Sequence, residues 1–329
     1  MIRFATIGTN FITEWFLEAA KRCDAVEYLG AYSRSAEKAR RFANAHGAPL
    51  AFDDLEELAA HPDIDAVYIA SPNSFHYPQA ARMLRHGKHV LCEKTITANY
   101  PELTELIAVA KEHHVVLMEA MRSVHTRGFA VLQNNLHKLG TIRRATFQYC
   151  QYSSRYDNYK KGIIENAFDP HYANGALMDI GVYCVHPLVK LFGMPLSIHA
   201  DALILQNGID GAGTILAKYP EMQAELLYSK ITNSALPSQI QGENGSLLIE
   251  EIPNPHKLTI VYRDGTTEAL LNEPEARDLL SELNVWAACI QSGKILHPNL
   301  ACSEMELRIL DEARKQQGIH FPSDEGRIF

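Results

Sequence analysis

The first 120 residues alternate between two hydrophobic periodicities, and this alternation limits the possible folds more than any other feature of the chain. Residues 2–7 form a compact apolar run that ends at Gly8, as a fully buried strand does. From Ile12 to Ala20 the apolar residues then recur at helical spacing. Further strands are predicted at 26–32, 66–70, 89–92 and 115–118, and helices at 35–45, 54–60, 75–86 and 101–112. Because parallel strands need crossover helices, this alternation predicts a parallel sheet covered on both faces.

The pattern changes near residue 120, where short strand-like segments begin to follow one another with few helices between them. Such a run is typical of an open, mostly antiparallel sheet. The strands are predicted at 142–152, 197–205, 213–218, 223–228, 238–242, 246–250 and 258–262, and the flanking helices at 175–191, 276–291 and 303–316. We therefore expect an α/β protein with a doubly wound parallel sheet in domain 1–121. An α/β domain with an open, mostly antiparallel sheet should follow at 122–329.

The composition of the chain limits the classes of partner it can bind and the cellular compartment in which it works. The formal net charge of -8 argues against nucleic acid or an anionic membrane surface as a partner. The six cysteines form no CxxC pair and suggest reduced thiols, and no signal peptide or run of eighteen apolar residues is evident. The fifteen histidines show no HExxH or paired metal spacing. We expect a cytoplasmic protein that binds a small molecule and no metal.

The first strand ends in a partial dinucleotide fingerprint. Gly8 holds the place of the first glycine of GxGxxG, and Thr9, Asn10, Phe11 and Ile12 follow. A glycine turn there lets backbone N–H groups at the start of the next helix face a pyrophosphate. Asn10 can replace the second glycine because asparagine tolerates left-handed conformations. These five residues are predicted to bind the cofactor, although an ordinary strand–turn–helix connection has the same pattern.

The end of the second strand favours NADP over NAD. NAD enzymes usually place an acidic residue there to bond the ribose 2′-hydroxyl, whereas this chain has Ser33 and Arg34. Both side chains can donate hydrogen bonds to a 2′-phosphate, and Arg34 adds a positive charge. NAD remains possible, and the alternative interpretation is a helix N-cap followed by an exposed arginine.

Three further motifs point to a family. The chain has SPNSFH at 71–76, CEKT at 92–95 and NGALMDIGVY at 174–183. In this order and spacing they resemble the Gfo/Idh/MocA oxidoreductases, over a region that runs from the first strand to about residue 245. FDP at 168–170, with Tyr183, resembles the dihydrodiol and aldose dehydrogenase branch. The resemblance implies a Rossmann domain, an α/β domain, an NAD(P) cofactor and a substrate that is a sugar, polyol or cyclic diol.

The resemblance also implies roles for individual residues near the cofactor. These residues are Ser71, Pro72, Asn73 and His76 in the cofactor pocket, Glu93 and Lys94 near the nicotinamide ribose, and Arg122 near the nicotinamide end. All follow strands of the parallel sheet, whose carboxyl ends form the ligand crevice in such folds.

Tyr183, Lys94 and Asp179 are the candidate catalytic residues. Oxidation of an alcohol needs a group that takes the hydroxyl proton, and a tyrosine serves when a lysine cation stabilises its anion. Asp179 precedes Tyr183 by four residues, so both lie on one face of a helix and Asp179 orients the substrate or holds Lys94 charged. Alternatively, Asp179 caps or braces the helix. His186 is the next acid–base candidate and could line the substrate pocket.

Two departures from the family pattern carry their own expectations. Thr95 follows Lys94 where the family has proline, and a cis bond before threonine costs about 2.5–4 kcal/mol, so we expect a trans bond. Asn174 interrupts the glycine run and could narrow or repolarise the substrate pocket. These departures keep open a second function, that of a non-catalytic NADP-binding regulator.

The predicted antiparallel sheet also suggests an assembly. The strands between 197 and 262 leave one sheet face with no segment to cover it. An uncovered sheet face tends to bury itself against a symmetry mate. We therefore expect a homodimer, or a dimer of dimers, formed through that face.

Overall fold

A computed structural model describes residues 1–274 and 278–326 of the chain. The chain divides into two compact units, one of Met1–Met121 with Asp278–Glu304 and one of Arg122–Arg277 with Met305–Phe329. Residues 275–277 and 327–329 lie outside the described part. The segment Asp278–Glu304 belongs to the first unit, which differs from the expected placement of all of 122–329 in a second domain.

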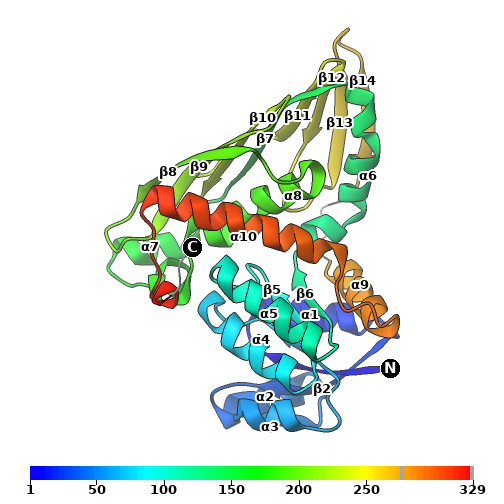
Figure 1. Ribbon diagram of the computed structural model, residues 1–329, viewed down its shortest axis with the longest axis vertical. Helices are drawn as coiled ribbons and strands as arrows, with labels where there is room; N and C mark the ends of the chain where they lie inside the picture. Colours follow the sequence, from blue (N-terminus) through cyan, green and yellow to red (C-terminus); the bar gives the residue numbers. More distant parts are fainter. Residues whose placement is uncertain (275–277, 327–329) are drawn as a thin grey trace. The chain divides into compact units, whose positions relative to one another are not determined.

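The first unit is built on a six-stranded sheet with the order β3-β2-β1-β4-β5-β6, and all its strand pairs are parallel (Figure 1). The strands are β1 (Ile2–Ile7), β2 (Val26–Tyr32), β3 (Leu50–Phe52), β4 (Ala66–Ile69), β5 (His89–Glu93) and β6 (Leu117–Ala120). The prediction of a doubly wound parallel sheet is thus confirmed. It omitted β3, whose three residues are too few to show a period.

Six α-helices of the described residues belong to this unit. They are α1 (Phe11–Ala20), α2 (Ala36–Ala45), α3 (Leu55–Ala60), α4 (His76–Arg85), α5 (Tyr100–Glu112) and α9 (Leu280–Gln291). Helix α9 packs against α1 and buries Leu283 and Trp286 completely in the same core as Phe16 and Tyr68. This apolar burial explains why the segment belongs to the first unit. The helix predicted at 276–291 begins at Leu280, and 276–277 lie outside the described residues.

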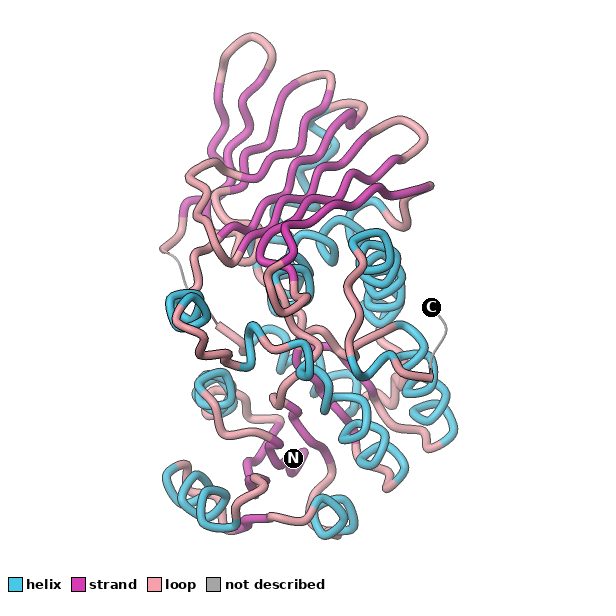
Figure 2. The backbone as a smooth tube through the Cα atoms, turned by 90° about the vertical axis from the view of Figure 1, so that its left-hand side faces the viewer, coloured by secondary structure: helices cyan, strands magenta, loops and turns pink. Residues whose placement is uncertain are grey.

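The second unit contains an eight-stranded sheet with the order β14-β13-β12-β11-β7-β10-β9-β8. Its strands are β7 (Ile142–Cys150), β8 (Ser197–Ile204), β9 (Asp210–Lys218), β10 (Gln223–Ser229), β11 (Ser238–Gly242), β12 (Gly245–Ile249), β13 (Lys257–Tyr262) and β14 (Thr267–Asn272). Only β7 and β10 pair in parallel, so the prediction of a mostly antiparallel sheet is confirmed, although it lacked β14. Figure 2 shows these strands as one continuous layer.

Helices α6 (Arg127–Asn135) and α8 (Val182–Phe192) lie on the same face of this sheet (Figure 1). Helix α7 (Ser154–Lys160) also belongs to this unit, and α10 (Pro298–Gln317) begins in the first unit and ends in the second. The stretch Pro170–Phe192 is long and apolar enough to cross a membrane by length and composition, but 72% of its apolar window is buried. Such burial is typical of a core helix in a soluble protein.

Candidate active site

Strand order in the first unit reverses between β1 and β4, and the motif residues after these strands meet there. Gly8 has a φ of +113°, and a Cβ on it would lie 2.6 Å from the carbonyl oxygen of Ala70. The side-chain amide of Asn10 donates a hydrogen bond to the same oxygen at 2.7 Å. A crevice at the carboxyl ends of the strands beside such a reversal is where doubly wound sheets bind ligands.

Asn10 acts differently from the expectation. It is the N-cap of α1, and its Oδ1 accepts hydrogen bonds from the N–H groups of Ile12 at 3.1 Å and Thr13 at 3.2 Å. Its φ of -99° is not left-handed, so the expected glycine-like role is wrong. The reason is that an N-cap residue adopts extended backbone angles while its side chain bonds the first helical N–H groups. Thr9 and Phe11, on either side of Asn10, lie at the start of α1, with Phe11 exposed.

Ser33 and Arg34 lie directly after β2, at the same edge of the sheet. Arg34 is exposed, with its guanidinium carbon 5.7 Å from the centre of the Phe75 ring. Within residues 1–274 and 278–326, no carboxylate forms a salt bridge with it. Ser35, and not Ser33, caps α2 through a 3.3 Å bond from the N–H of Lys38. The arginine is therefore available to an anionic ligand.

The segment at 71–76 surrounds a fully buried histidine. The Ser71 hydroxyl donates to Gln79 at 2.6 Å, and Pro72 and Asn73 lead into a short 3-10 turn before α4. His76 Nε2 lies 2.8 Å from the Ser71 carbonyl oxygen, and Nδ1 lies 2.8 Å from that of Thr95. Burial lowers the pKa of His76. Its ring thus joins the loop after β4 to the loop after β5 from within the protein interior, and any direct contact with a cofactor stays a prediction.

Glu93 is the last residue of β5 and Lys94 is the first residue of the loop after it, and both are partly exposed. Glu93 accepts a 2.6 Å hydrogen bond from the hydroxyl of Tyr68, whose pKa burial raises well above its ordinary value. The peptide bond between Lys94 and Thr95 is cis, so the expected trans bond is wrong. The preference of a peptide bond before threonine for the trans form does not decide the state of this bond, because tertiary contacts hold the loop in place. Thr95 is fully buried against His76, and the next N–H, that of Ile96, donates to Glu119 at 3.0 Å.

In the second unit, Asp179 lies in a π-helical turn and Tyr183 follows in α8. The turn, η6 (Leu177–Gly181), interrupts the α-helix expected over 175–191. A π-turn has a wider repeat than an α-helix, but residues four apart still lie close to one face of it, so the shared face of Asp179 and Tyr183 stays a prediction. Tyr183 is half-buried, and its ring packs edge-on to that of Tyr149 with centres 5.7 Å apart. Asp179 forms a 2.7 Å ion pair with Lys230.

Two other predicted residues of this unit have protein partners. His186 is fully buried, and its Nδ1 lies 2.5 Å from a carboxylate oxygen of Glu306. This burial does not fit a residue that lines an accessible substrate pocket. Arg122 is half-buried and donates to the side-chain oxygen of Asn254 at 3.3 Å. Its proposed contact with the nicotinamide end stays a prediction.

Sequence reasoning missed several residues that shape these loops, among them Tyr68, Glu119, Asp210 and Lys230. Each lies outside the motifs, and no periodicity or spacing distinguishes it from an ordinary strand residue. Asp210 and Lys230 lie at strand ends, and polar residues are common there. Their positions in the sequence therefore give no sign of a special role. Their partners become evident only when distant segments are brought together.

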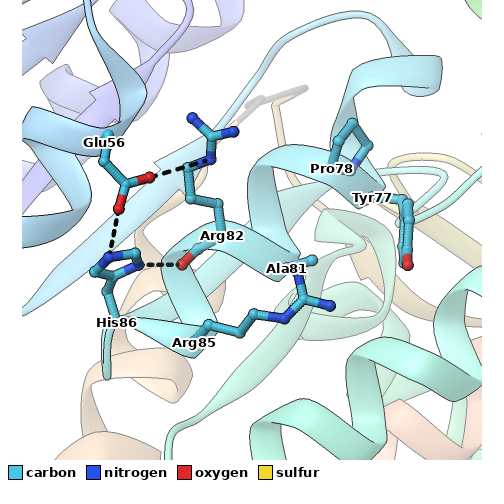
Figure 3. A pocket seen from close by; sticks show the side chains of 7 residues that line it. All are labelled: Glu56, Tyr77, Pro78, Ala81, Arg82, Arg85 and His86. Atoms are coloured by element: carbon cyan, nitrogen blue, oxygen red, sulfur yellow. Dashed lines mark hydrogen bonds and ion pairs between the residues drawn. The ribbon is translucent and has the colours of Figure 1, made fainter.

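A pocket of about 350 Å³ in the first unit lies apart from all the motif residues. It runs along α4 and is lined by Glu56, Tyr77, Pro78, Ala81, Arg82, Arg85 and His86. Figure 3 shows Glu56 bridging Arg82 at 3.7 Å and His86 at 2.7 Å. None of the predicted cofactor or catalytic residues lines it, so it is not the candidate active site.

Comparison with known proteins identifies the family. Residues 2–121 match the model described as "Oxidoreductase family, NAD-binding Rossmann fold", and residues 136–248 match the "GFO/IDH/MocA C-terminal domain". The chain belongs to the Gfo/Idh/MocA oxidoreductase family. As a member of that family it is an oxidoreductase with an NAD-binding Rossmann domain.

Relatives in the Gfo/Idh/MocA family match the chain over nearly its whole length. A scyllo-inositol 2-dehydrogenase (NADP(+)) of Bacillus subtilis is 46% identical over 99% of this chain and 100% of its own length. A trans-1,2-dihydrobenzene-1,2-diol dehydrogenase of Xenopus laevis is 30% identical over 97% and 99%. A solved 3-ketoreductase from Actinomadura kijaniata, 24% identical over 98% and 99%, has a TM-score of 0.85 and supports the fold.

Proposed function

We propose that this protein is an NADP-preferring dehydrogenase of polyols, sugars or cyclic diols. It would move a hydride between the nicotinamide and a carbon that bears a hydroxyl or carbonyl group. The observation that carries the substrate class is the full-length similarity to an NADP-dependent inositol dehydrogenase, together with the similarity to dihydrodiol dehydrogenases. Both substrates named there have hydroxyl groups on adjacent ring carbons, and we expect the same chemistry here.

The residues at the edge of the parallel sheet fit a nicotinamide dinucleotide. The Gly8 turn leaves no room for a side chain between β1 and Ala70, and the N-terminus of α1 begins directly after Asn10. That arrangement suits a pyrophosphate. Ser33 and Arg34 supply donors and a positive charge for a 2′-phosphate. Calorimetric titration of the protein should therefore show tighter binding of NADP(H) than of NAD(H), and equal affinities would contradict the assignment.

Bound NADP would supply the hydride acceptor, and residues of the protein would accept and donate the proton of the substrate hydroxyl. We assign Tyr183 as the group that takes the proton from the substrate hydroxyl, and returns it in the reverse direction. The edge-on contact with Tyr149 favours one orientation of the Tyr183 ring. Lys94 would donate a hydrogen bond to the substrate oxygen and stabilise the tyrosinate. Asp179 would orient a second substrate hydroxyl.

A substrate screen tests this function. Reduction of NADP⁺ is followed at neutral and alkaline pH with aldoses, inositols and cyclic diols, and oxidation of NADPH with dicarbonyls. We expect turnover with at least one polyol or diol, and its loss in Tyr183→Phe. A protein that binds NADP(H) but turns over none of these compounds would support the alternative, a non-catalytic regulator. The similarity to named dehydrogenases makes that alternative the weaker one.

We also propose a homodimer, or a dimer of dimers, formed through the open face of the eight-stranded sheet. Leu203 on β8 and Leu216 on β9 are 55% and 50% exposed. Strand pairing of Leu216 with His199 and of Leu203 with Ala212 places both leucines on one face of the sheet. Exposed apolar side chains in a sheet face favour burial against a second copy. The acidic net charge of -8 and the reduced cysteines support a cytoplasmic protein without nucleic-acid or membrane partners.

A further inference from the structure

Lys230 is a buried cation that lies in none of the family motifs. It follows β10 directly and is only 3% exposed. Its ammonium group donates to Asp179 Oδ2 at 2.7 Å and to the Ala167 carbonyl oxygen at 2.8 Å, and lies 4.8 Å from the centre of the Phe168 ring. A buried charge is costly unless it is paired and hydrogen-bonded, and all three contacts compensate this one.

The sheet fixes the position from which Lys230 reaches Asp179. The backbone N–H of Lys230 donates to the Gly211 carbonyl oxygen at 2.9 Å, and its carbonyl oxygen accepts from the N–H of Ser153 at 2.8 Å. The side chain therefore starts from a backbone held on two sides. It connects the end of β10 to the π-helical turn η6, 51 residues away in the sequence.

A second charged residue from the same end of the sheet holds the start of that turn. Asp210, the first residue of β9, is fully buried, and its Oδ2 accepts the N–H of Leu177 at 2.6 Å. A Cβ on Gly175 would lie 2.1 Å from Oδ1 of this carboxylate, so the close approach requires glycine. Asp210 and Lys230 together hold η6 at its first residue and at Asp179.

We propose that Lys230 is a positioning residue for the reaction, which acts by holding the Asp179 carboxylate ionised and in one orientation. The proposal rests on the role assigned to Asp179 in the proposed function. Asp179 remains 32% exposed at its side chain, so a carboxylate held in this way stays accessible to a substrate hydroxyl. Stability alone does not account for the pair, because a well-packed apolar residue usually stabilises a protein as much as a buried ion pair.

Substitution of the lysine, with an exposed lysine as the control, tests the proposal. Lys230→Met removes the charge and keeps most of the chain length, and Lys230→Arg keeps the charge. Lys257→Met is the control, because Lys257 pairs with Glu250 at 3.6 Å where both side chains are about half exposed. Each variant is checked for folding by circular dichroism and for NADPH binding by fluorescence. Its kcat, KM and pH profile are then measured with the substrate found in the screen.

Lys230→Met should lower kcat by about 10²-fold, the usual cost of misplacing a reacting group, with NADPH affinity unchanged. The acid limb of its pH profile should move up by about 1–3 pH units, because the carboxylate loses a neighbouring positive charge. Asp179 and Asp210 are the carboxylates that face this cation, and the profile of Asp210→Asn separates their contributions. Lys230→Arg should recover most of the loss, and Lys257→Met should match the wild type.

A double-mutant cycle distinguishes positioning from general support of the fold. In an Asp179→Asn background, Lys230→Met should cost little more, because the lysine acts through the carboxylate. Wild-type kcat and pH profile in Lys230→Met would overturn the proposal, and so would losses that multiply in the cycle. If Lys230→Met does not fold, Lys230→Gln replaces it in the same measurements. Wild-type turnover in Asp179→Asn alone would instead contradict the role of Asp179 in the proposed function.

Discussion

Asp210 offers a prediction whose size follows from the structure. Burial raises the pKa of this carboxyl group to about 6, against the opposing effects of the Leu177 and Ala176 N–H groups and the Lys230 cation. The group lies at the start of the π-helical turn that contains Asp179. Protonation of Asp210 near pH 6 therefore bears on both the stability of the second unit and the geometry of the candidate site.

The sign and the size of the effect can be worked out. The ordinary pKa of the group is 3.8, so between about pH 4 and pH 6 the native protein binds more protons at this site than the unfolded chain does. Stability must then fall as the pH rises through this window. The displacement from 3.8 to about 6 corresponds to about 3 kcal/mol of unfolding free energy. Asp210→Asn keeps an oxygen for the Leu177 N–H and removes the titration, so it should remove this pH dependence.

Urea unfolding followed by circular dichroism, at pH values from 3 to 7.5, measures the effect. The difference in unfolding free energy between Asp210→Asn and the wild type should change by about 3 kcal/mol, in favour of the variant at the higher pH values. Asp201→Asn, an exposed aspartate on β8, is the matched control and should show no such change. A difference between Asp210→Asn and the wild type that is constant over the whole pH range would refute the assignment of the raised pKa to Asp210.

Three further predictions concern cofactor, catalysis and assembly. Arg34→Ala should weaken NADP(H) binding by about 1.5–3 kcal/mol in calorimetry while leaving NAD(H) unaffected, and equal losses would exclude a 2′-phosphate contact. Tyr183→Phe should lower kcat by about 10²–10⁴ with cofactor affinity unchanged, and Lys94→Ala at least as far. The loss of kcat in the double variant should be far smaller than the product of the two single losses, because the two residues act as one unit. Losses that multiply would mean that the two residues have independent roles. Leu216→Arg should convert a dimer to a monomer in light scattering, and a monomeric wild type at micromolar concentration would contradict the proposed interface.

Much of the fold could be predicted because the buried face of each helix or strand produces a periodic pattern of apolar residues in the sequence. Strand β1 matches its predicted bounds of 2–7, and β2 matches 26–32, since each is a mostly apolar run. The helix predicted at 35–45 matches α2, whose N-cap Ser35 accepts the Lys38 N–H. The motif residues after β1, β4 and β5 also lie at the carboxyl edge of the sheet, as their positions after strands require.

Other features depend on which distant segments meet, and local patterns do not contain that information. The three-residue strand β3 exists because β2 lies beside it, and α9 belongs to the first unit because Trp286 is buried there. The cis bond at Lys94 and the π-helical turn at Asp179 likewise differ from what local preference favours. Lys230 meets Asp179 across 51 residues, and Asp210 meets Leu177 across 33. Such contacts are decided by strand register and chain topology, because a buried charge takes whichever partner the folded backbone brings within hydrogen-bond distance.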